Sequence, residues 1–157
     1  MASREEVERF AERLAERFEG KILERYLKPF AKSSCIYLRV GKEHLREVAE
    51  ALFKELEGKL STISAVEHAS FLELVYHFTL PEGILVNVKV ELSKERPEVP
   101  SLTPLMAGAS FIEREVKDLF GVEFQGHPDP RRLILPDDWP EGVYPLRRSY
   151  KAGGKHA

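Results

Sequence analysis

The sequence has little of what a metal or cofactor site usually requires. Its 157 residues include one cysteine, Cys35. A single thiolate cannot by itself hold an iron–sulfur cluster or a structural zinc ion. Cys35 lies in an alternating apolar stretch, where a small buried residue on a strand is the favoured interpretation. We therefore expect no cofactor and no metal in this chain.

Long apolar runs and an excess of one charge are also missing. No run of 18 apolar residues occurs, so no transmembrane helix is predicted. The formal net charge is −2, from 24 basic and 26 acidic side chains, which gives no electrostatic case for nucleic acid. The charged N-terminal stretch has no apolar core, so no secretory signal is expected. Scarce Asn and Gln (Asn87, Gln125) with 32% charged residues are typical of hyperthermophile proteins, so a thermophilic source is expected.

The length fits one domain, and the periodicity of residues 1–96 predicts an α+β fold with a mainly antiparallel sheet and helices on one face. Ser3 and Glu6 form a capping-box pattern at the start of the first helix. Pro81 and Gly83 mark a short turn that would pair two strands antiparallel. The predicted helices cover residues 3–18 and 42–57, and the predicted strands cover 34–40, 60–68, 71–80 and 84–92.

Residues 97–121 are expected to continue this domain with two short helices. One would begin at Thr103 as N-cap, with Pro104 in its first turn. The other would begin at Ser110, with Glu113 completing a second capping box, and would end at Gly121 in the left-handed conformation.

Residues 122–157 are predicted to form an extended, proline-rich C-terminal arm. Eight of the ten prolines lie between Pro97 and Pro145. The arm keeps many apolar residues but shows no helical or strand period, which a disordered tail would not do. Composition leaves two surfaces open for these apolar side chains, namely the chain's own domain and a partner.

The charges at 113–118 are typical of a solvated helix face with pairs four residues apart. Glu113 and Glu115 are two residues apart and point to different sides of a helix, so they cannot share a substrate proton. No Walker loop, dinucleotide fingerprint, nucleophile elbow or HExxH helix is present.

His127 is the other residue that chemistry could use. Metal binding is disfavoured because none of the other histidines shows ligand spacing to it. A structural hydrogen bond inside the loop, with Asp129 as a candidate partner, is the favoured interpretation. The basic pairs at 131–132 and 147–148 fit either solvent exposure or bidentate docking on carboxylates of a partner.

Several of these short motifs together resemble the signature of the NuoC family, the hydrophilic peripheral-arm subunit of respiratory complex I. The resemblance is strong over residues 97–148 and rests on PSLT at 100–103, ERE at 113–115, DLFG at 118–121, GHPD at 126–129, RRL at 131–133 and PLR at 145–147. The stretch LPDDWP at 135–140 looks most like the branch found in archaeal membrane-bound hydrogenases and sulfane reductases. Phe111 and Tyr144 stand where relatives often have Trp and His.

The resemblance implies a cofactor-free structural or assembly subunit in the cytoplasmic arm of a membrane-bound, ion-translocating oxidoreductase. Such a subunit docks on the NiFe-type large subunit beside the small iron–sulfur subunit, and ferredoxin would be the electron donor. Iron–sulfur clusters and a possible NiFe centre would belong to those partners. The alternatives are a subunit of an NADH- or F420-dependent, quinone-reducing complex I, and a stand-alone binding module. A freestanding enzyme using the charged helix and His127 is a third.

The motif positions are the candidates for the partner interface, with no catalytic residue among them. We expect the arginines to act in assembly, and the arm to be ordered mainly by a partner. The candidates are Glu113, Arg114, Glu115, Asp118, Phe120, Gly121, Gly126, His127, Pro128, Asp129, Arg131, Arg132, Pro145, Leu146 and Arg147.

Overall fold

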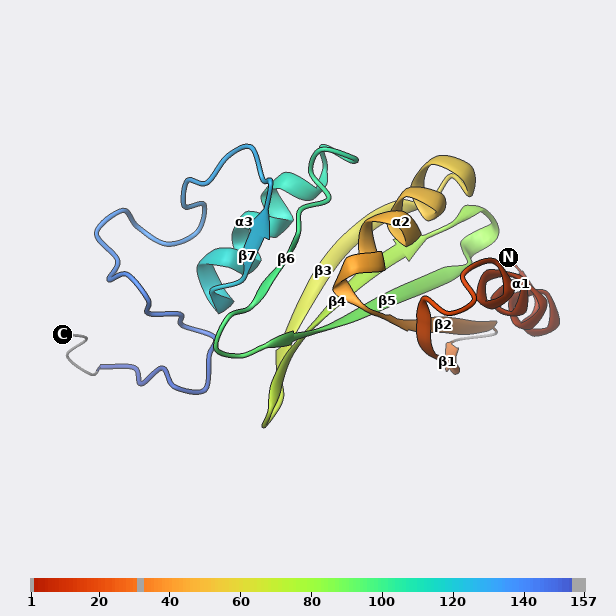
Figure 1. The fold of residues 1–157 in the computed structure, drawn as a ribbon, viewed down its shortest axis with the longest axis horizontal. Helices are drawn as coiled ribbons and strands as arrows, with labels where there is room; N and C mark the ends of the chain where they lie inside the picture. Colours follow the sequence, from red (N-terminus) through yellow and green to blue (C-terminus); the bar gives the residue numbers. More distant parts are fainter. Residues whose placement is uncertain (1, 31–32, 154–157) are drawn as a thin grey trace.

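The main element of the protein is a five-stranded mixed sheet, seen in a computed structural model that describes residues 2–30 and 33–153 (Figure 1). The strand order is β1-β2-β5-β4-β3. β2 and β5 run parallel, and the other three neighbouring pairs are antiparallel. The predicted α+β fold is confirmed, but the parallel pair was not foreseen. The strands are β1 Ile22–Phe30, β2 Ser33–Val40, β3 Lys59–Glu67, β4 Phe71–Thr79 and β5 Leu85–Ser93.

The strand β1 was missed because its sequence, ILERYLKPF, mixes charge with a proline. It lies at the edge of the sheet, where a proline is tolerated because one side of the strand makes no ladder bonds. Its Tyr26 lies opposite Tyr37 of β2, and their rings stack with centroids 4.9 Å apart.

Helices pack on one face of the sheet. The capping box of α1 (Arg4–Arg17) is confirmed, since the Ser3 hydroxyl accepts from the Glu6 amide and the Glu6 carboxylate accepts from the Ser3 amide. The second helical stretch consists of three pieces: η1 (Lys42–His44), α2 (Leu45–Glu50) and a π-helical turn, η2 (Ala51–Glu55). The apolar sides of the helices join the inward residues of β2, β4 and β5 in one core.

The predicted β4–β5 hairpin is confirmed, with a 3-10 turn, η3 (Pro81–Gly83), between its strands. The residues of β4 that were predicted to share a face, Leu72, Leu74, Tyr76 and Phe78, are all buried, but Glu73 and Val75 on the other face are buried as well.

The segment after β5 differs from the prediction. No helix begins at Thr103; residues 101–108 form turns, in which the Met106 amide donates to the Leu102 carbonyl. α3 (Ala109–Phe120) begins after Gly108, so the predicted N-cap at Ser110 is wrong. Two short strands that were not predicted, β6 (Glu98–Pro100) and β7 (Glu123–Gln125), pair in parallel on either side of α3 in the sequence.

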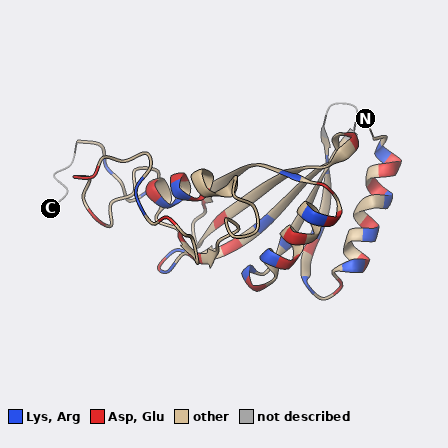
Figure 2. Cartoon of the chain, turned by 90° about the horizontal axis from the view of Figure 1, so that it is seen from above, with Lys and Arg blue, Asp and Glu red and all other residues tan. Residues whose placement is uncertain are grey.

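Residues 126–153 are in loops and turns, and the structure does not show an extended arm. The segment instead returns to α3 through the bonds described below (Figure 1). The last four residues of the predicted arm, 154–157, lie outside the described residues. Within the described ranges, no helix has both the length and the apolarity needed to cross a membrane. Figure 2 shows basic and acidic residues interspersed along the helices, in keeping with the balanced composition.

Candidate functional site

The charged motif residues of α3 lie inside the molecule. Glu113 is 0% exposed, and Arg114 and Asp118 are buried, while Glu115 is exposed. The interpretation as a solvated face is therefore wrong for three of the five charged residues, since only Glu115 is exposed and Lys117 is half-buried. The expected pairs four residues apart are not formed, because Arg114 pairs with Asp129 and Lys117 with Glu123.

Glu113 holds the turn that precedes α3. Its carboxylate accepts hydrogen bonds from the Ser101 hydroxyl (2.5 Å), the Leu102 amide (2.6 Å) and the Thr103 hydroxyl (2.9 Å). Burial raises the pKa of Glu113, against the effect of these three donors, which favour the charged form. The predicted capping box is thus replaced by a carboxylate that reaches back ten to twelve residues.

Arg114 fixes the chain that follows the GHPD motif. Its guanidinium donates to the carbonyls of Arg131 (Nε, 2.9 Å) and Arg132 (Nη2, 2.9 Å). Its third nitrogen, Nη1, lies 3.2 Å from Asp129 Oδ2. One buried side chain therefore binds three points of a single loop.

Asp118, one turn further along α3, binds the next part of the same loop. Its Oδ2 accepts from three consecutive backbone amides, those of Leu133 (2.9 Å), Ile134 (2.8 Å) and Leu135 (3.1 Å). Consecutive amides that converge on one carboxylate oxygen form an anion-binding concavity of the kind called a nest. Arg114 and Asp118 together hold residues 129–135 along α3, and we call this segment the clamped loop.

The GHPD motif forms a tight turn at the start of this region. Gly126 has φ +80°, a conformation that favours glycine. The expected hydrogen bond between His127 and Asp129 is present, with the Asp129 amide donating to His127 Nδ1 over 3.0 Å. Asp129 also forms a bidentate pair with Arg131, and that hydrogen-bonded guanidinium holds the pKa of Asp129 well below its usual value. Pro128 is exposed at the tip.

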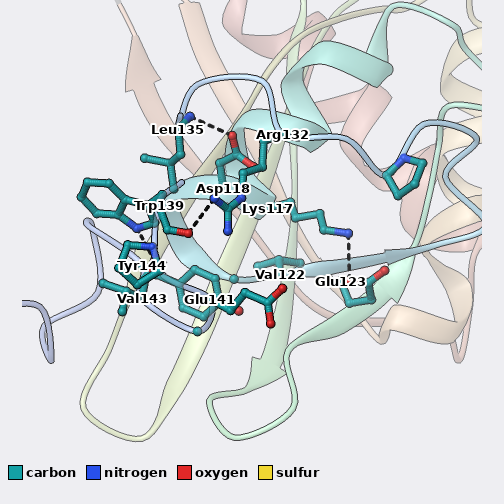
Figure 3. Close-up of a pocket in the computed structure, with 14 residues that line it drawn as sticks. Lys117, Asp118, Val122, Glu123, Arg132, Leu135, Trp139, Glu141, Val143 and Tyr144 are labelled. Carbon is teal, nitrogen blue, oxygen red and sulfur yellow. Dashed lines mark hydrogen bonds and ion pairs between the residues drawn. The ribbon is translucent and has the colours of Figure 1, made fainter. Parts of the chain in front are cut away.

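Arg132 of the clamped loop binds the segment that follows it, residues 136–139 (Figure 3). Its Nη1 donates to the carbonyls of Pro136 (2.9 Å), Asp137 (3.1 Å) and Trp139 (2.7 Å). A cavity of about 320 Å³ lies between this loop and the end of α3, lined by Lys117, Arg132, Trp139, Tyr144 and others. Its walls carry both charges and aromatic rings.

The PLR motif returns the chain to the end of α3. The Leu146 amide donates to the Leu119 carbonyl (3.1 Å), and Arg147 donates to the carbonyls of Lys94 (2.9 Å) and Phe120 (3.3 Å). Arg147 also lies 3.4 Å from Glu67 of β3. Pro145 and Phe120 are half-buried, and Leu146 is exposed.

Gly121 ends α3 in the left-handed conformation, as predicted, with φ +75°. The Tyr144 ring lies directly against it, so that a Cβ placed on Gly121 would come within 2.3 Å of the ring. Gly121 therefore both caps the helix and leaves the space against which Tyr144 packs.

Four residues of the site were not among the predicted site residues. Ser101 belongs to the PSLT motif at 100–103, but its bond to Glu113 was not predicted. Glu67 lies far from the motif in sequence, and no period or spacing marks it. Phe111, the residue that replaces Trp, is 63% exposed on α3, and Ile134 of the clamped loop is 53% exposed. Across residues 2–30 and 33–153, no group of three or more His, Cys, Asp or Glu side chains is placed to hold a metal ion.

Lys117→Ala should leave the domain stable. Lys117 pairs with Glu123 at 3.2 Å, but both side chains are partly or largely in solvent, and such pairs are worth little. The free energy of unfolding should fall by about 0.5 kcal/mol or less in urea denaturation. A loss well above 1 kcal/mol would contradict this, whereas an unchanged fold with weakened binding to a partner protein would place this face in an interface.

A solved structure shares this architecture. A chain in the structure of the membrane-bound sulfane sulfur reductase, an archaeal respiratory membrane complex, superposes with a TM-score of 0.79. The match covers 92% of this chain and 85% of the other, at 24% sequence identity. At that identity, the similarity establishes a shared α+β fold.

The sequence itself identifies the family. Residues 38–156 match the family described as respiratory-chain NADH dehydrogenase, 30 Kd subunit. The chain therefore belongs to this family, and the resemblance found in its motifs is confirmed.

Relatives occur in hydrogenase complexes as well as in complex I. Formate hydrogenlyase subunit 5 of Escherichia coli is 34% identical over 140 residues, 86% of this chain but 24% of that one. A NADH-quinone oxidoreductase subunit of Moorella thermoacetica is 41% identical over 64% of this chain and 72% of its own length. Membrane-bound hydrogenase subunit beta of Pyrococcus furiosus is 31% identical over 74% of this chain and 70% of its own length. The chain thus spans about a quarter of the formate hydrogenlyase subunit.

Proposed function

We propose that the chain is a structural and assembly subunit in the cytoplasmic arm of a membrane-bound, ion-translocating oxidoreductase. In this proposal it docks on the NiFe-type large subunit and reaches the membrane only through other subunits. It carries no cofactor, and the iron–sulfur clusters and any NiFe centre belong to its partners. Family membership and the names of the relatives support this interpretation.

The observation that carries the proposal is the use of the motif side chains within the chain itself. Glu113 accepts from three donors of the preceding turn. Asp118 accepts from three amides of the clamped loop. Carboxylates whose lone pairs are taken by fixed donors are suited to holding a surface in shape, and poorly placed to accept a substrate proton.

The surface that these bonds hold in shape is the proposed docking site. Phe111 of α3 and Ile134 of the clamped loop present large apolar side chains to solvent. The charged residues Glu115 and Arg131 are exposed on the same helix and loop. Apolar anchors with charged residues around them are the usual anatomy of a protein interface.

The formate hydrogenlyase relative supports the choice of occupant. Only 24% of that chain aligns with this protein, so most of its polypeptide is additional to the shared domain. We infer that the additional part corresponds to the partner that this chain meets as a separate protein. In the proposal, that partner is the NiFe-type large subunit.

The formate hydrogenlyase alignment supports the hydrogenase-linked branch, for which we propose ferredoxin as donor. This relative aligns over 86% of the chain, against 74%, 71% and 64% for three NADH-quinone oxidoreductase subunits, whereas the Pyrococcus hydrogenase subunit, at 74%, falls within the range of those three. The higher identity of the Moorella protein, 41%, supports the alternative of a quinone-reducing complex I. The proteins that co-purify with the chain from its source cells would separate the two.

The docking surface can be tested by charge insertion. Phe111→Asp and Ile134→Asp should each lower co-purification with the co-expressed large subunit by about tenfold or more, as expected for apolar anchors. The matched control is Leu23→Asp, because Leu23 is 61% exposed on β1 and β1 lies at the opposite end of the molecule from α3 (Figure 1).

The control should co-purify like the parent. If all three variants bind equally well, the surface is not the interface. If none of the proteins, the parent included, binds the large subunit, the proposed function itself fails, and the stand-alone binding module becomes the better description. Circular dichroism of each variant checks that the exposed substitutions leave the fold intact.

A further inference from the structure

The His127 ring lies between a hydrogen-bond donor, the Asp129 amide, and a hydrogen-bond acceptor, the Ser110 carbonyl. Its side chain is only 8% exposed. Nδ1 lies 3.0 Å from the Asp129 amide nitrogen, and Nε2 lies 3.2 Å from the Ser110 carbonyl oxygen. Glu113 Oε2 is 3.8 Å from the same Nε2. The ring thus faces a fixed donor on one side and acceptors on the other.

These neighbours determine the form of the ring. A backbone amide can only donate, so Nδ1 must be the unprotonated nitrogen of a neutral imidazole. Nε2 then carries the hydrogen and donates it to the Ser110 carbonyl. The observed geometry fits the neutral ring in this tautomer alone.

A second proton on the ring would break this arrangement. It would add to Nδ1, which could then no longer accept the hydrogen bond from the Asp129 amide, because both groups would be donors. On the Nε2 side the charged ring would be stabilised, because the imidazolium would lie near the buried Glu113 carboxylate. A cavity of about 90 Å³ borders the ring, Glu113 and Asp129, so the turn has space to move.

The charged groups that line the cavity beside the ring come from three elements. Glu113, Arg114 and Lys117 belong to α3, Glu123 to β7, and Asp129 to the turn itself. Asp129 is the group that connects the ring to the rest of the site, because it pairs with both Arg114 and Arg131. Movement of Asp129 therefore reaches the clamped loop.

We propose that His127 is a proton-sensitive latch of the clamped loop. The neutral ring closes the 127–129 turn, and the charged ring opens the turn and binds to Glu113 instead. Asp129 is then released from Arg114, which loosens the first part of the loop while Asp118 still holds residues 133–135. The inference concerns this chain alone and does not depend on which complex it joins.

The tautomer and the amide can be read from the same sample. Long-range proton–nitrogen spectra of the histidine-labelled full chain should show the His127 ring protonated at Nε2 at high pH and at both nitrogens at low pH. Protection of the Asp129 amide from hydrogen exchange should fall about fivefold over the same transition, the amount expected for one lost hydrogen bond. The Gly121 amide, which donates to the Lys117 carbonyl at the end of α3, should keep its protection.

Two variants distinguish the effect of His127 from a general loosening of the fold at low pH. His127→Asn keeps an acceptor near the position of Nδ1 that does not titrate, so Asp129 protection should become independent of pH. His127→Gln places its amide near the position of Nε2 instead, so Asp129 should stay about fivefold less protected at every pH. An Nδ1-protonated neutral ring, or the parental pH dependence in His127→Asn, would overturn the proposal. The parent spectrum decides by itself if either variant does not fold.

Discussion

Asp118→Asn should lower the free energy of unfolding by about 3 kcal/mol and release residues 133–135 from α3. The carboxylate is 6% exposed, and one of its oxygens accepts from three amides at 2.8–3.1 Å. Hydrogen bonds to a charged group are the strong ones, with a net contribution to stability of about 1.5–3 kcal/mol each. Asparagine keeps the shape and can place its carbonyl oxygen at the position of Oδ2, but the three amides then bind a neutral acceptor and lose the stabilisation that the charge provides.

Urea denaturation measures the loss, and hydrogen exchange of the Leu133, Ile134 and Leu135 amides locates it. Glu115→Gln is the matched control, since it removes the same charge from the same helix at an exposed position. It should change stability by no more than about 0.5 kcal/mol. If Asp118→Asn unfolds like this control, the three hydrogen bonds contribute no net stability.

The same measurement decides what orders the C-terminal segment. Its apolar content without a period led to the expectation that a partner orders it. The structure offers an internal cause, because Arg132 and Arg147 bind backbone carbonyls of their own chain. Strong protection of residues 133–135 in the isolated parent would favour this internal account, and weak protection there would favour the partner.

The elements that the sequence predicted well are those whose pattern is local. The Ser3–Glu6 capping box and the shared inward face of Leu72, Leu74, Tyr76 and Phe78 in β4 both depend on neighbours within a few residues, and both are present. β1 was missed since an edge strand needs only one apolar face, and Pro29 reads as a breaker. β6 and β7 are three residues each, too short to show any period.

The motif was found from the sequence, but the contacts of its side chains were not. A twelve-residue helix with alternating charge has the pattern of a solvated face, and only the return of residues 126–147 buries it. The bonds of Glu113 to Ser101 and of Arg147 to Glu67 join positions 12 and 80 apart. Spacing within a helix carries no information on such contacts, so the expected pairs four residues apart were the wrong ones. Whether the motif residues also meet a partner stays a prediction.

Substitution of Gly121 should be the most costly change at the end of α3. Gly121→Val should lower the free energy of unfolding by about 4 kcal/mol, through backbone strain of about 1–3 kcal/mol and overpacking of about 1–3 kcal/mol. Valine is β-branched and poorly tolerated at φ +75°. Its side chain would also enter the space of the Tyr144 ring.

Alanine variants separate the two causes. Gly20 has φ +77° and nothing within 4 Å of the position that a methyl group would take, so Gly20→Ala should cost only the left-handed strain of about 1–2 kcal/mol. Gly121→Ala has the same strain plus the contact with Tyr144 at 2.3 Å, and it should cost clearly more. Introducing Gly121→Ala into a Tyr144→Ala background should remove the excess, giving a coupling energy of about 1–2 kcal/mol in a double-mutant cycle. If Gly121→Ala and Gly20→Ala are equally destabilising in urea denaturation, the close packing of Tyr144 against Gly121 has no energetic role, and Gly121 acts only as a helix cap.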